Sequence, residues 1–387
     1  MADIGNETVS GDKDLDSVVS LEDVMVRDSL PDEEATVFKA IRYNDIEMLA
    51  RQFRDGVDVS IKYDGPKYHL KCSTMTHRIC MSGYTPLHVA VLHALIKTVE
   101  FLVDEGADVN IKDAFDRTPL HLAVIAGRHQ VIAYLINKGA DLNAQSSSGR
   151  TALHEATLGG KWPIVRQLVS AGAKLDLMDL KGTTVLMNVV FTKNVNTEIL
   201  EFLLKSGCDV NQENGKGATA LFLATGMRDL NTMKILLKHG ANINQADING
   251  FTPFHLHGEE GGGGKTTCFL IHSGADINCI DKKGRSPLMK AVKLGNIRLI
   301  MILLKADCNC QPQSLLRQPR VQELCERVPQ FRTWLEMEVN SPRTLKRLCR
   351  QEIRTLLSPY RTTAIPFLEI PTVLKDFLLA RDVQSIN

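Results

Sequence analysis

Residues 257–267, HGEEGGGGKTT, are of types that can bind phosphate groups. A nucleotide-binding P-loop reads G-x-x-x-x-G-K-[ST] and joins a strand to a helix, so that backbone amides and the lysine surround the phosphates. Lys265 and Thr266 fit the end of this pattern, but Glu259 stands where its first glycine is required. The preceding FTPFHLH has the pattern of a helix and not of a strand. We therefore expect an expanded turn between two helices, and no nucleotide site.

A second candidate site is the set His69, Cys72, His77 and Cys80, spaced H-x2-C-x4-H-x2-C. Imidazole and thiolate are ligands that zinc prefers. The loop between the two pairs is short, however, and the pattern matches no established zinc signature. We therefore expect a long loop with incidental cysteines, no bound metal and no cofactor. A metal- or nucleotide-dependent enzyme that uses this set or Lys265 is the alternative, which metal analysis and nucleotide binding would test.

The composition narrows the classes of function. A net charge of +1 provides no overall attraction to nucleic acid or to a membrane surface. The sequence has no apolar run long enough to span a bilayer and no start like that of a secretory signal. Nine scattered cysteines, an odd number, indicate reduced thiols in the cytoplasm or the nucleus. Without a nucleophile elbow or an H-E-x-x-H motif, we do not expect an enzyme.

The strongest pattern is a repeat with a period close to 33 residues. The phrase T-P-L-H-x-A or a weaker copy begins at intervals of 33, 33, 33, 35, 33 and 34 residues, at Thr85, Thr118, Thr151, Thr184, Thr219, Thr252 and Ser286. A second phrase, typified by GADVN, keeps the same period from Gly106, Gly139, Gly172, Gly207, Gly240 and Gly274. A degenerate copy at Thr36 makes eight. This pattern resembles the ankyrin repeat over residues 34–310, with an insertion at 63–80.

One copy shows the physical logic of the repeat. Thr118 can cap a helix whose first residue is Pro119, where no amide hydrogen bond is lost. Gly127 interrupts it, and QVIAYLINKG forms a second helix that ends at Gly139. The apolar side chains at helical spacing in this second helix are Val131, Ile132, Leu135 and Ile136. A single copy cannot bury its apolar face alone, so the copies must stack.

The resemblance implies an all-α fold, an ankyrin-repeat solenoid of helix pairs with β-hairpin fingers. His88, His121, His154 and His255 recur with the repeat. Periodic histidines are more readily explained as scaffold residues that bond to the backbone than as catalytic or metal-binding groups.

The period stops after residue 310. We expect an acidic, solvated tail at 1–33, a helical linker or cap at 311–340, and a separate module at 341–387. In that module Ser341 can cap a helix and Pro342 can begin it. The helix carries one apolar stripe, made of Leu345, Leu348, Cys349, Ile353 and Leu356.

This module is similar to a SOCS box. The BC box of that family reads [APST]-L-x-x-x-C-x-x-x-[AILV], and residues 344–353, TLKRLCRQEI, fit every specified position. The resemblance implies that elongin C binds Leu345, Leu348, Cys349 and Ile353. The cullin box reads L-P-x-P-x-x-L-x-x-Y-L, and its counterparts here, implied to bind the cullin, are Leu368, Pro371, Leu374 and Phe377. Glu369 departs from the pattern, because it stands where the first proline is expected.

The combination resembles the ankyrin repeat and SOCS box family. It implies a non-catalytic, substrate-recognition adaptor of an elongin B/C–cullin-5 RING E3 ubiquitin ligase, which binds a protein target through its repeats and promotes ubiquitination and proteasomal degradation. Repeat proteins bind partners through extended surfaces, so we expect target contacts at finger residues Phe115, Arg150, Leu180, Phe251 and Arg285. The alternative is an interaction scaffold without a ligase role, whose C-terminal helix only caps the solenoid.

Overall fold

The computed structural model describes residues 32–62, 69–70, 79–80, 82–192, 195–256, 264–306, 308 and 312–340. The chain divides into two compact units, Met1–Ser148 and Gly149–Asn387, which we describe separately. The tail predicted over 1–33 lies outside the described residues apart from its last two, which begin the first helix. In the described part of the chain, no helix is both long enough and apolar enough to cross a membrane.

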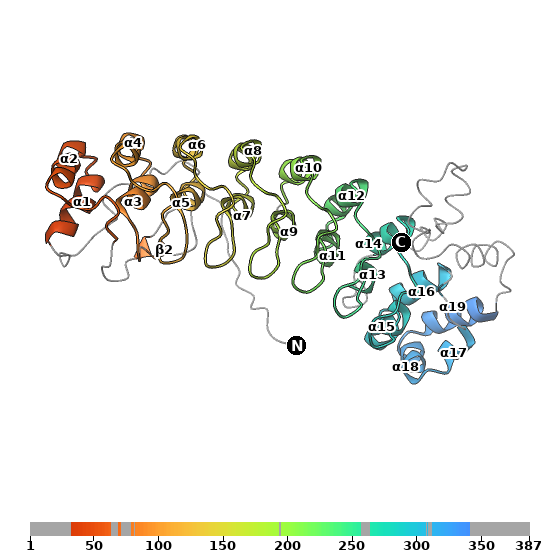
Figure 1. Cartoon of the computed structure of the whole chain (residues 1–387). Helices are drawn as coiled ribbons and strands as arrows, with labels where there is room; N and C mark the ends of the chain where they lie inside the picture. The colour runs from red at the N-terminus through yellow and green to blue at the C-terminus, as the bar shows by residue number, and fades with distance from the viewer. Residues whose placement is uncertain are drawn as a thin grey trace. The chain divides into compact units, whose positions relative to one another are not determined.

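The first unit contains three helix pairs (Figure 1). The helices are α1 (Asp32–Arg42), α2 (Ile46–Arg54), α3 (Pro86–Leu92), α4 (Ile96–Asp104), α5 (Pro119–Ile125) and α6 (His129–Asn137). Helix α3 packs between α1 and α5, and α4 packs against α6. In the predicted insertion, β1 (His69–Leu70) pairs antiparallel with β2 (Ile79–Cys80), with His69 opposite Cys80.

The second unit continues the pattern with five pairs and ends in three further helices. The pairs are α7 (Ala152–Leu158) with α8 (Trp162–Ser170), α9 (Val185–Phe191) with α10 (Thr197–Lys205), α11 (Ala220–Gly226) with α12 (Leu230–Lys238), α13 (Pro253–Leu256) with α14 (Gly264–His272), and α15 (Pro287–Leu294) with α16 (Ile297–Lys305). The last three are α17 (Pro312–Leu316), α18 (Pro319–Arg327) and α19 (Pro329–Asn340). The fold is the predicted all-α stack of ankyrin-type helix pairs.

The local signals of the repeat act as predicted. Thr118 precedes α5 in an extended conformation, and Pro119 is the first helical residue. Gly127 and Gly139 have positive φ angles of 72° and 86°, which favour glycine because an L side chain is strained there. In α6 the residues Val131, Ile132 and Leu135 are buried, whereas Ile136 is only half-buried.

Five of the fingers, the turns between successive pairs, are closed by an Asp or Asn side chain, whereas Ser146 stands at the equivalent position of another finger. The Asp113 carboxylate accepts the amides of Phe115 and Arg117 at 2.8 Å each, and the Asp113 amide donates to the Arg117 carbonyl at 3.0 Å. The same amide-to-carboxylate pattern recurs in the second unit at Asp179, Asp247 and Asp281, and with an amide oxygen at Asn214. These five fingers are therefore side-chain-closed turns. Among the described residues, only β1 and β2 form paired strands.

Neighbouring fingers stack through one backbone hydrogen bond each. In the second unit the carbonyls of Lys181, Lys216 and Asn249 accept the amides of Gly215, Ile248 and Lys282, at 3.2, 3.1 and 3.0 Å. The residue after each of these carbonyls is a glycine with positive φ. A Cβ added at Gly250 would lie 2.7 Å from the Lys282 amide nitrogen. The glycine is thus required by the turn and by the close approach of the next finger.

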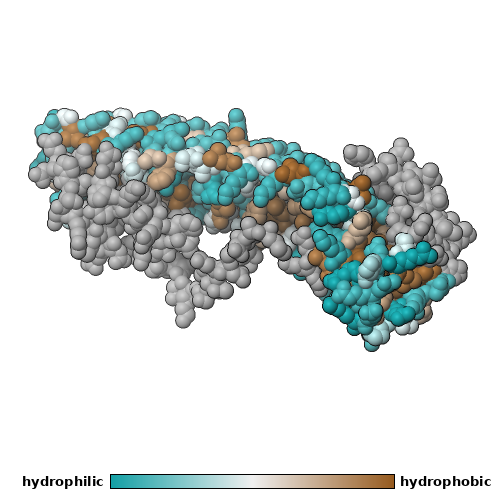
Figure 2. Space-filling view, turned by 90° about the horizontal axis from the view of Figure 1, so that it is seen from below, coloured by the Kyte–Doolittle hydropathy of each residue, from teal (hydrophilic) through white to brown (hydrophobic). Residues whose placement is uncertain are grey.

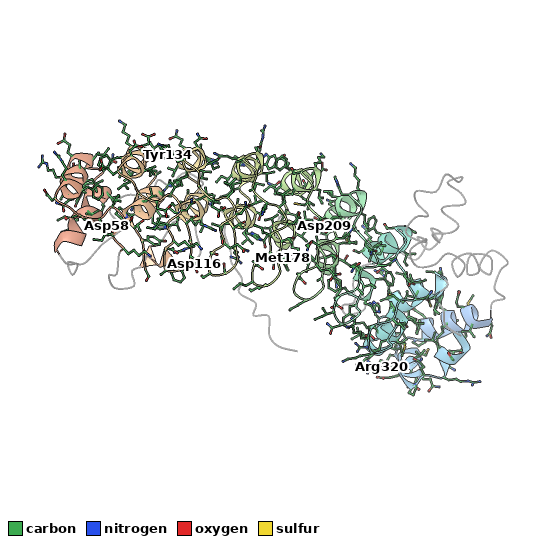
Figure 3. All side chains as sticks on the ribbon, in the orientation of Figure 1. Asp58, Asp116, Tyr134, Met178, Asp209 and Arg320 are labelled. Atoms are coloured by element: carbon green, nitrogen blue, oxygen red, sulfur yellow. The ribbon has the colours of Figure 1, made fainter. Side chains whose placement is uncertain are left out.

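In the first unit the corresponding position of one finger is occupied by Asp116, with φ of 56°. Figure 3 labels this residue, and also Tyr134 on α6. Aspartate is one of the few side chains that tolerate this conformation, because its short polar group can bond locally.

The HGEEGGGGKTT stretch differs in part from the expected turn. Residues 257–263 lie outside the described residues, but Gly264–Thr267 form the first turn of α14. Thr266 and Thr267 are each 4% exposed, whereas Lys265 is exposed. Burial of these two threonines, together with Leu270 and Ile271, draws the end of the glycine run into the helix. The Thr266 hydroxyl, which a P-loop would offer to a metal ion, is therefore buried.

The finger contact can be tested with two glycine substitutions. Gly250→Ala should cost about 3 kcal/mol of unfolding free energy, because it strains a positive φ and pushes the next finger away. Gly284→Ala should cost only about 1 kcal/mol, since φ there is similar (69°) but no described atom lies within 4 Å of the added Cβ. Urea unfolding of both variants measures the difference, and equal losses would show that finger stacking contributes little.

Candidate protein-binding surface

The five predicted target-binding residues lie in the fingers, but most of them also stabilise the finger that carries them. In the first unit Phe115 is 39% exposed, and its ring lies 4.9 Å from the Arg117 guanidinium carbon. Arg117 also forms an ion pair with Asp113 at 2.7 Å and donates to the Tyr84 hydroxyl at 3.0 Å. Phe115 thus covers a charged network and leaves only part of its ring for a partner.

A similar network holds Phe251 and Arg285 in the second unit. The Phe251 ring is half-buried and contacts two cations, with the Lys290 ammonium 4.6 Å and the Arg285 guanidinium carbon 5.7 Å from its centroid. Arg285 pairs with the buried Asp281 carboxylate at 2.7 Å. Lys290 also donates to the His255 carbonyl at 3.2 Å. These residues join the sixth and seventh fingers to the helices behind them.

Arg150 and Leu180 are less constrained. Arg150 is about one-third exposed and lies 3.7 Å from Glu155 and 3.9 Å from Asp179, distances that make only weak ion pairs. Leu180 is 78% exposed at the tip of its finger. Ile248, which we did not predict, is 54% exposed at the same register position two fingers later. Aligning the residues after Asp179 and Asp247 would have revealed it.

The periodic histidines have the predicted scaffold role. The Thr85 amide donates to Nδ1 of His88 at 3.2 Å, so Nδ1 is the acceptor. The proton therefore lies on Nε2, which donates to the Arg117 carbonyl of the next finger at 3.2 Å. His154 and His255 repeat both bonds, reaching the carbonyls of Thr183 and Arg285. Each histidine thus joins its own helix start to the following finger.

These histidines are held neutral. Burial lowers the pKa of His88 to about 4, because the charged ring loses its hydration, and the hydrogen bond to the Arg117 carbonyl only partly offsets this. Burial also lowers the pKa of His154 and of His255. Cys279 contacts His255 and Thr252, but burial raises the pKa of its thiol to about 12, so it is not a reactive thiolate.

Two of the four residues of the zinc candidate, His69 and Cys80, lie opposite each other in the pair of strands β1 and β2. Cys72 and His77 lie outside the described residues, and for His69 and Cys80 only the backbone pairing is described. No cluster of three potential ligands occurs among the described side chains. The absence of metal therefore stays a prediction.

Apolar and hydrophilic residues are interspersed over the side of the repeats seen from below (Figure 2). Such a mixed surface suits recognition of a protein partner, because apolar anchors and polar contacts can act together.

The buried histidines predict a loss of stability in mild acid. Above pH 6.5 His88 is neutral in both states, whereas between pH 6.5 and 4 the unfolded chain binds a proton that the folded chain excludes. The unfolding free energy should therefore fall as the pH falls through this range, by about 3 kcal/mol for His88 alone.

His88→Met isolates that contribution, since Met187 occupies the equivalent position of another repeat and is fully buried. Urea unfolding at pH 7.5 and pH 5 should show a smaller pH-dependent loss in this variant, by about 2 kcal/mol. The exposed His129, changed to Met, is the control and should retain the full loss. An unchanged pH dependence in the His88 variant would contradict the assignment.

Comparison with protein families agrees with this architecture. Residues 106–179 and 186–261 match the family described as ankyrin repeats (3 copies), and residues 82–114 match the ankyrin repeat. Residues 341–379, which lie outside the described residues, match the SOCS box. Ankyrin repeats bind proteins, and the SOCS box links proteins to elongin B/C–cullin E3 ligases.

Similar proteins share part of the chain. The putative palmitoyltransferase ZDHHC13 of Danio rerio is 34% identical over 113 residues, 29% of this chain and 18% of that protein. Rabankyrin-5 of Homo sapiens is 30% identical over 124 residues, 29% of this chain and 11% of that protein. This chain therefore spans less than a fifth of either relative.

The crystal structure of the ankyrin repeat domain of Bcl-3, a member of the IkappaB protein family, has 30% identity and a TM-score of 0.48, and covers 54% of this chain and 95% of that one. With ankyrin repeats followed by a SOCS box, the chain belongs to the ankyrin repeat and SOCS box family.

Proposed function

We propose that this protein is the substrate-recognition adaptor of an elongin B/C–cullin-5 RING E3 ubiquitin ligase. The observation that carries the proposal is the presence, in one chain, of stacked ankyrin repeats and a SOCS box at residues 341–379. The adaptor supplies no catalytic residue. It accelerates ubiquitination by holding a target near the ubiquitin-loaded enzyme, because confinement replaces a rare collision with a local encounter. The target is then degraded by the proteasome, which locates this function in the cytoplasm or nucleus.

Elongin C recognition rests on the stripe of the BC-box helix. Leu345, Leu348, Cys349 and Ile353 fall on one face, and an amphipathic helix of this kind can insert that face into an apolar groove. The small Cys349 side chain suits a narrow part of such a groove. Elongin B is recruited through elongin C.

Cullin-5 recognition rests on Leu368, Pro371, Leu374 and Phe377. Phe377 keeps the ring of the usual tyrosine without its hydroxyl. Glu369 replaces the first proline of the motif, and it adds both a charge and the backbone freedom that a proline would remove. We infer that this position lowers the affinity for the cullin.

Targets are proposed to bind the finger side of the repeats. Leu180 and Ile248 are the exposed apolar anchors, and Arg150 and the accessible part of Phe115 are further contacts. Phe251 and Arg285 are proposed to contribute mainly by positioning their fingers, since both are engaged in the network around Asp281 and Lys290.

The scaffold alternative requires residues after 340 to cap the repeats. Helices α17–α19 already provide buried apolar side chains at that end, namely Leu315, Val321, Leu324, Phe331 and Leu335, and α18 packs against α15. A terminal repeat needs one such cover. This packing supports the adaptor function, because it makes a second cap unnecessary.

The elongin assignment predicts opposite results for two neighbouring substitutions. Cys349→Phe should abolish co-purification with co-expressed elongins B and C on size exclusion, because the large ring clashes in the groove. Arg350→Phe, which adds the same ring off the apolar stripe, should leave the complex intact. If wild-type chain that is folded by circular dichroism forms no elongin complex, the ligase function is wrong.

The departure at Glu369 predicts a gain of function. Glu369→Pro should strengthen binding of the elongin-bound chain to cullin-5 by roughly tenfold, because it restores the rigid backbone and removes a charge from the contact. Surface plasmon resonance on the purified ternary complex measures this. Pro371→Ala is the opposite control and should weaken cullin binding without loss of elongin. No change for Glu369→Pro would show that this position makes no contact.

A further inference from the structure

The finger stack of the second unit ends in an open edge at the eighth repeat. Three carbonyls in series, those of Lys181, Lys216 and Asn249, each accept an amide from the next finger. The equivalent carbonyl of the last finger belongs to Lys283, and no described finger follows it. Gly284, the glycine of that finger, has no described atom within 4 Å of a Cβ built on it. The edge therefore keeps the shape of a stacking site without a described occupant.

Met289 extends this edge along α15. It occupies the position at which His88, His154 and His255 reach the following finger. Met289 is 53% exposed, whereas those histidines are at most 1% exposed. The difference follows from the missing finger, because the histidine position is buried only when a finger covers it. A flexible thioether side chain at such a place suits an adaptable contact.

The three C-terminal helices leave this edge uncovered. A Cβ built on Gly295, at the far end of α15, would lie 3.2 Å from the Leu324 side chain of α18. Helix α15 has eight residues, so its two ends are about 12 Å apart. The cap therefore covers the repeat at Gly295 and not at Gly284. An exposed backbone carbonyl in this position can accept an amide from another polypeptide.

The charge of the edge selects the kind of partner. Lys282 and Lys283 on the finger, and Lys293 on α15, are exposed and form no ion pair with a described residue. The adjacent carboxylate, that of Asp281, is buried and already bound to Arg285. The uncompensated positive charge favours an acidic partner. Met289 adds exposed apolar surface, which a peptide can match better than the phosphate backbone of a nucleic acid.

We propose that the open edge at Lys282, Lys283, Gly284 and Met289 binds an acidic segment of a target protein, whose backbone amide donates to the Lys283 carbonyl in place of an eighth finger. The proposal rests on the proposed function in one respect, that the repeats hold a target. The inference goes beyond that function by naming the place where the target binds. It also names what the target carries, namely acidic side chains interspersed with apolar ones on an extended or turning backbone.

The test uses the full chain in complex with elongins B and C and a fluorescein-labelled peptide that alternates aspartate with leucine around a central glycine. Fluorescence anisotropy should show binding that weakens as salt is raised. Lys282→Glu combined with Lys283→Glu should raise the Kd by at least roughly tenfold. The matched control, Lys234→Glu with Lys238→Glu on the exposed face of α12, makes the same change of net charge and should leave the Kd unchanged.

A second pair of variants tests the apolar part of the edge. Met289→Glu should also weaken peptide binding, whereas Met337→Glu, on the exposed side of α19, should not. Circular dichroism and elongin co-purification establish that each variant is folded. Equal weakening in the edge and control variants would overturn the proposal.

Three further outcomes would overturn it. Equally tight binding of an oligothymidine would show that the lysines of the edge bind nucleic acid. Self-association that the lysine variant abolishes, without peptide binding, would assign the edge to a second copy of the chain. A wild-type complex that contains elongins but binds no peptide would refute this inference and leave the ligase function standing. Peptide binding by a chain that recruits no elongin would support this inference and refute the ligase function.

Discussion

The structure depends on the inability of any one repeat to bury its own apolar face. Each helix pair is short, seven to nine residues per helix in most of the array, which is too short to be stable in water alone. Stability therefore comes from the contact between neighbours. At the finger tips that contact includes a hydrogen bond from a backbone amide to a carbonyl, beside a glycine that in most fingers leaves room for the approach. Side-chain bonds such as that from the Asn242 amide to Asn211 also join neighbouring fingers.

The same constraint explains how residues with catalytic potential are used in the packing of the repeats. The histidines stay neutral because each is buried between its own helix and the next finger, where both ring nitrogens have backbone partners. The aspartates of the fingers are occupied by backbone amides. Thr266 of the glycine-rich stretch is buried in α14. The histidines thus join one repeat to the next, whereas the aspartates close the fingers that carry them.

Neighbour-dependent stability also makes the ends of the array different from its middle. An internal finger offers its edge to the next finger, whereas the last finger keeps its edge and its lysines unpaired by any described finger. The helices α17–α19 cover the helical end of the last repeat. One end of α15 is therefore covered by these helices, and its other end remains accessible. The last repeat of such an array therefore exposes surface that the internal repeats bury against their neighbours, and a target can bind there.

The sequence alone predicted much of the fold of this protein. The period and its phrases predicted the helix pairs and their caps, because Thr118, Pro119 and Gly139 act within one or two turns of the backbone. The match of residues 341–379 was likewise readable from spacing. Tertiary structure decided what the surface offers. Leu180 stays exposed while Phe251 and Arg285 are engaged, and Met289 is open where a histidine would be buried. These outcomes depend on which finger or helix lies next in space, and a local pattern of residues does not contain that information.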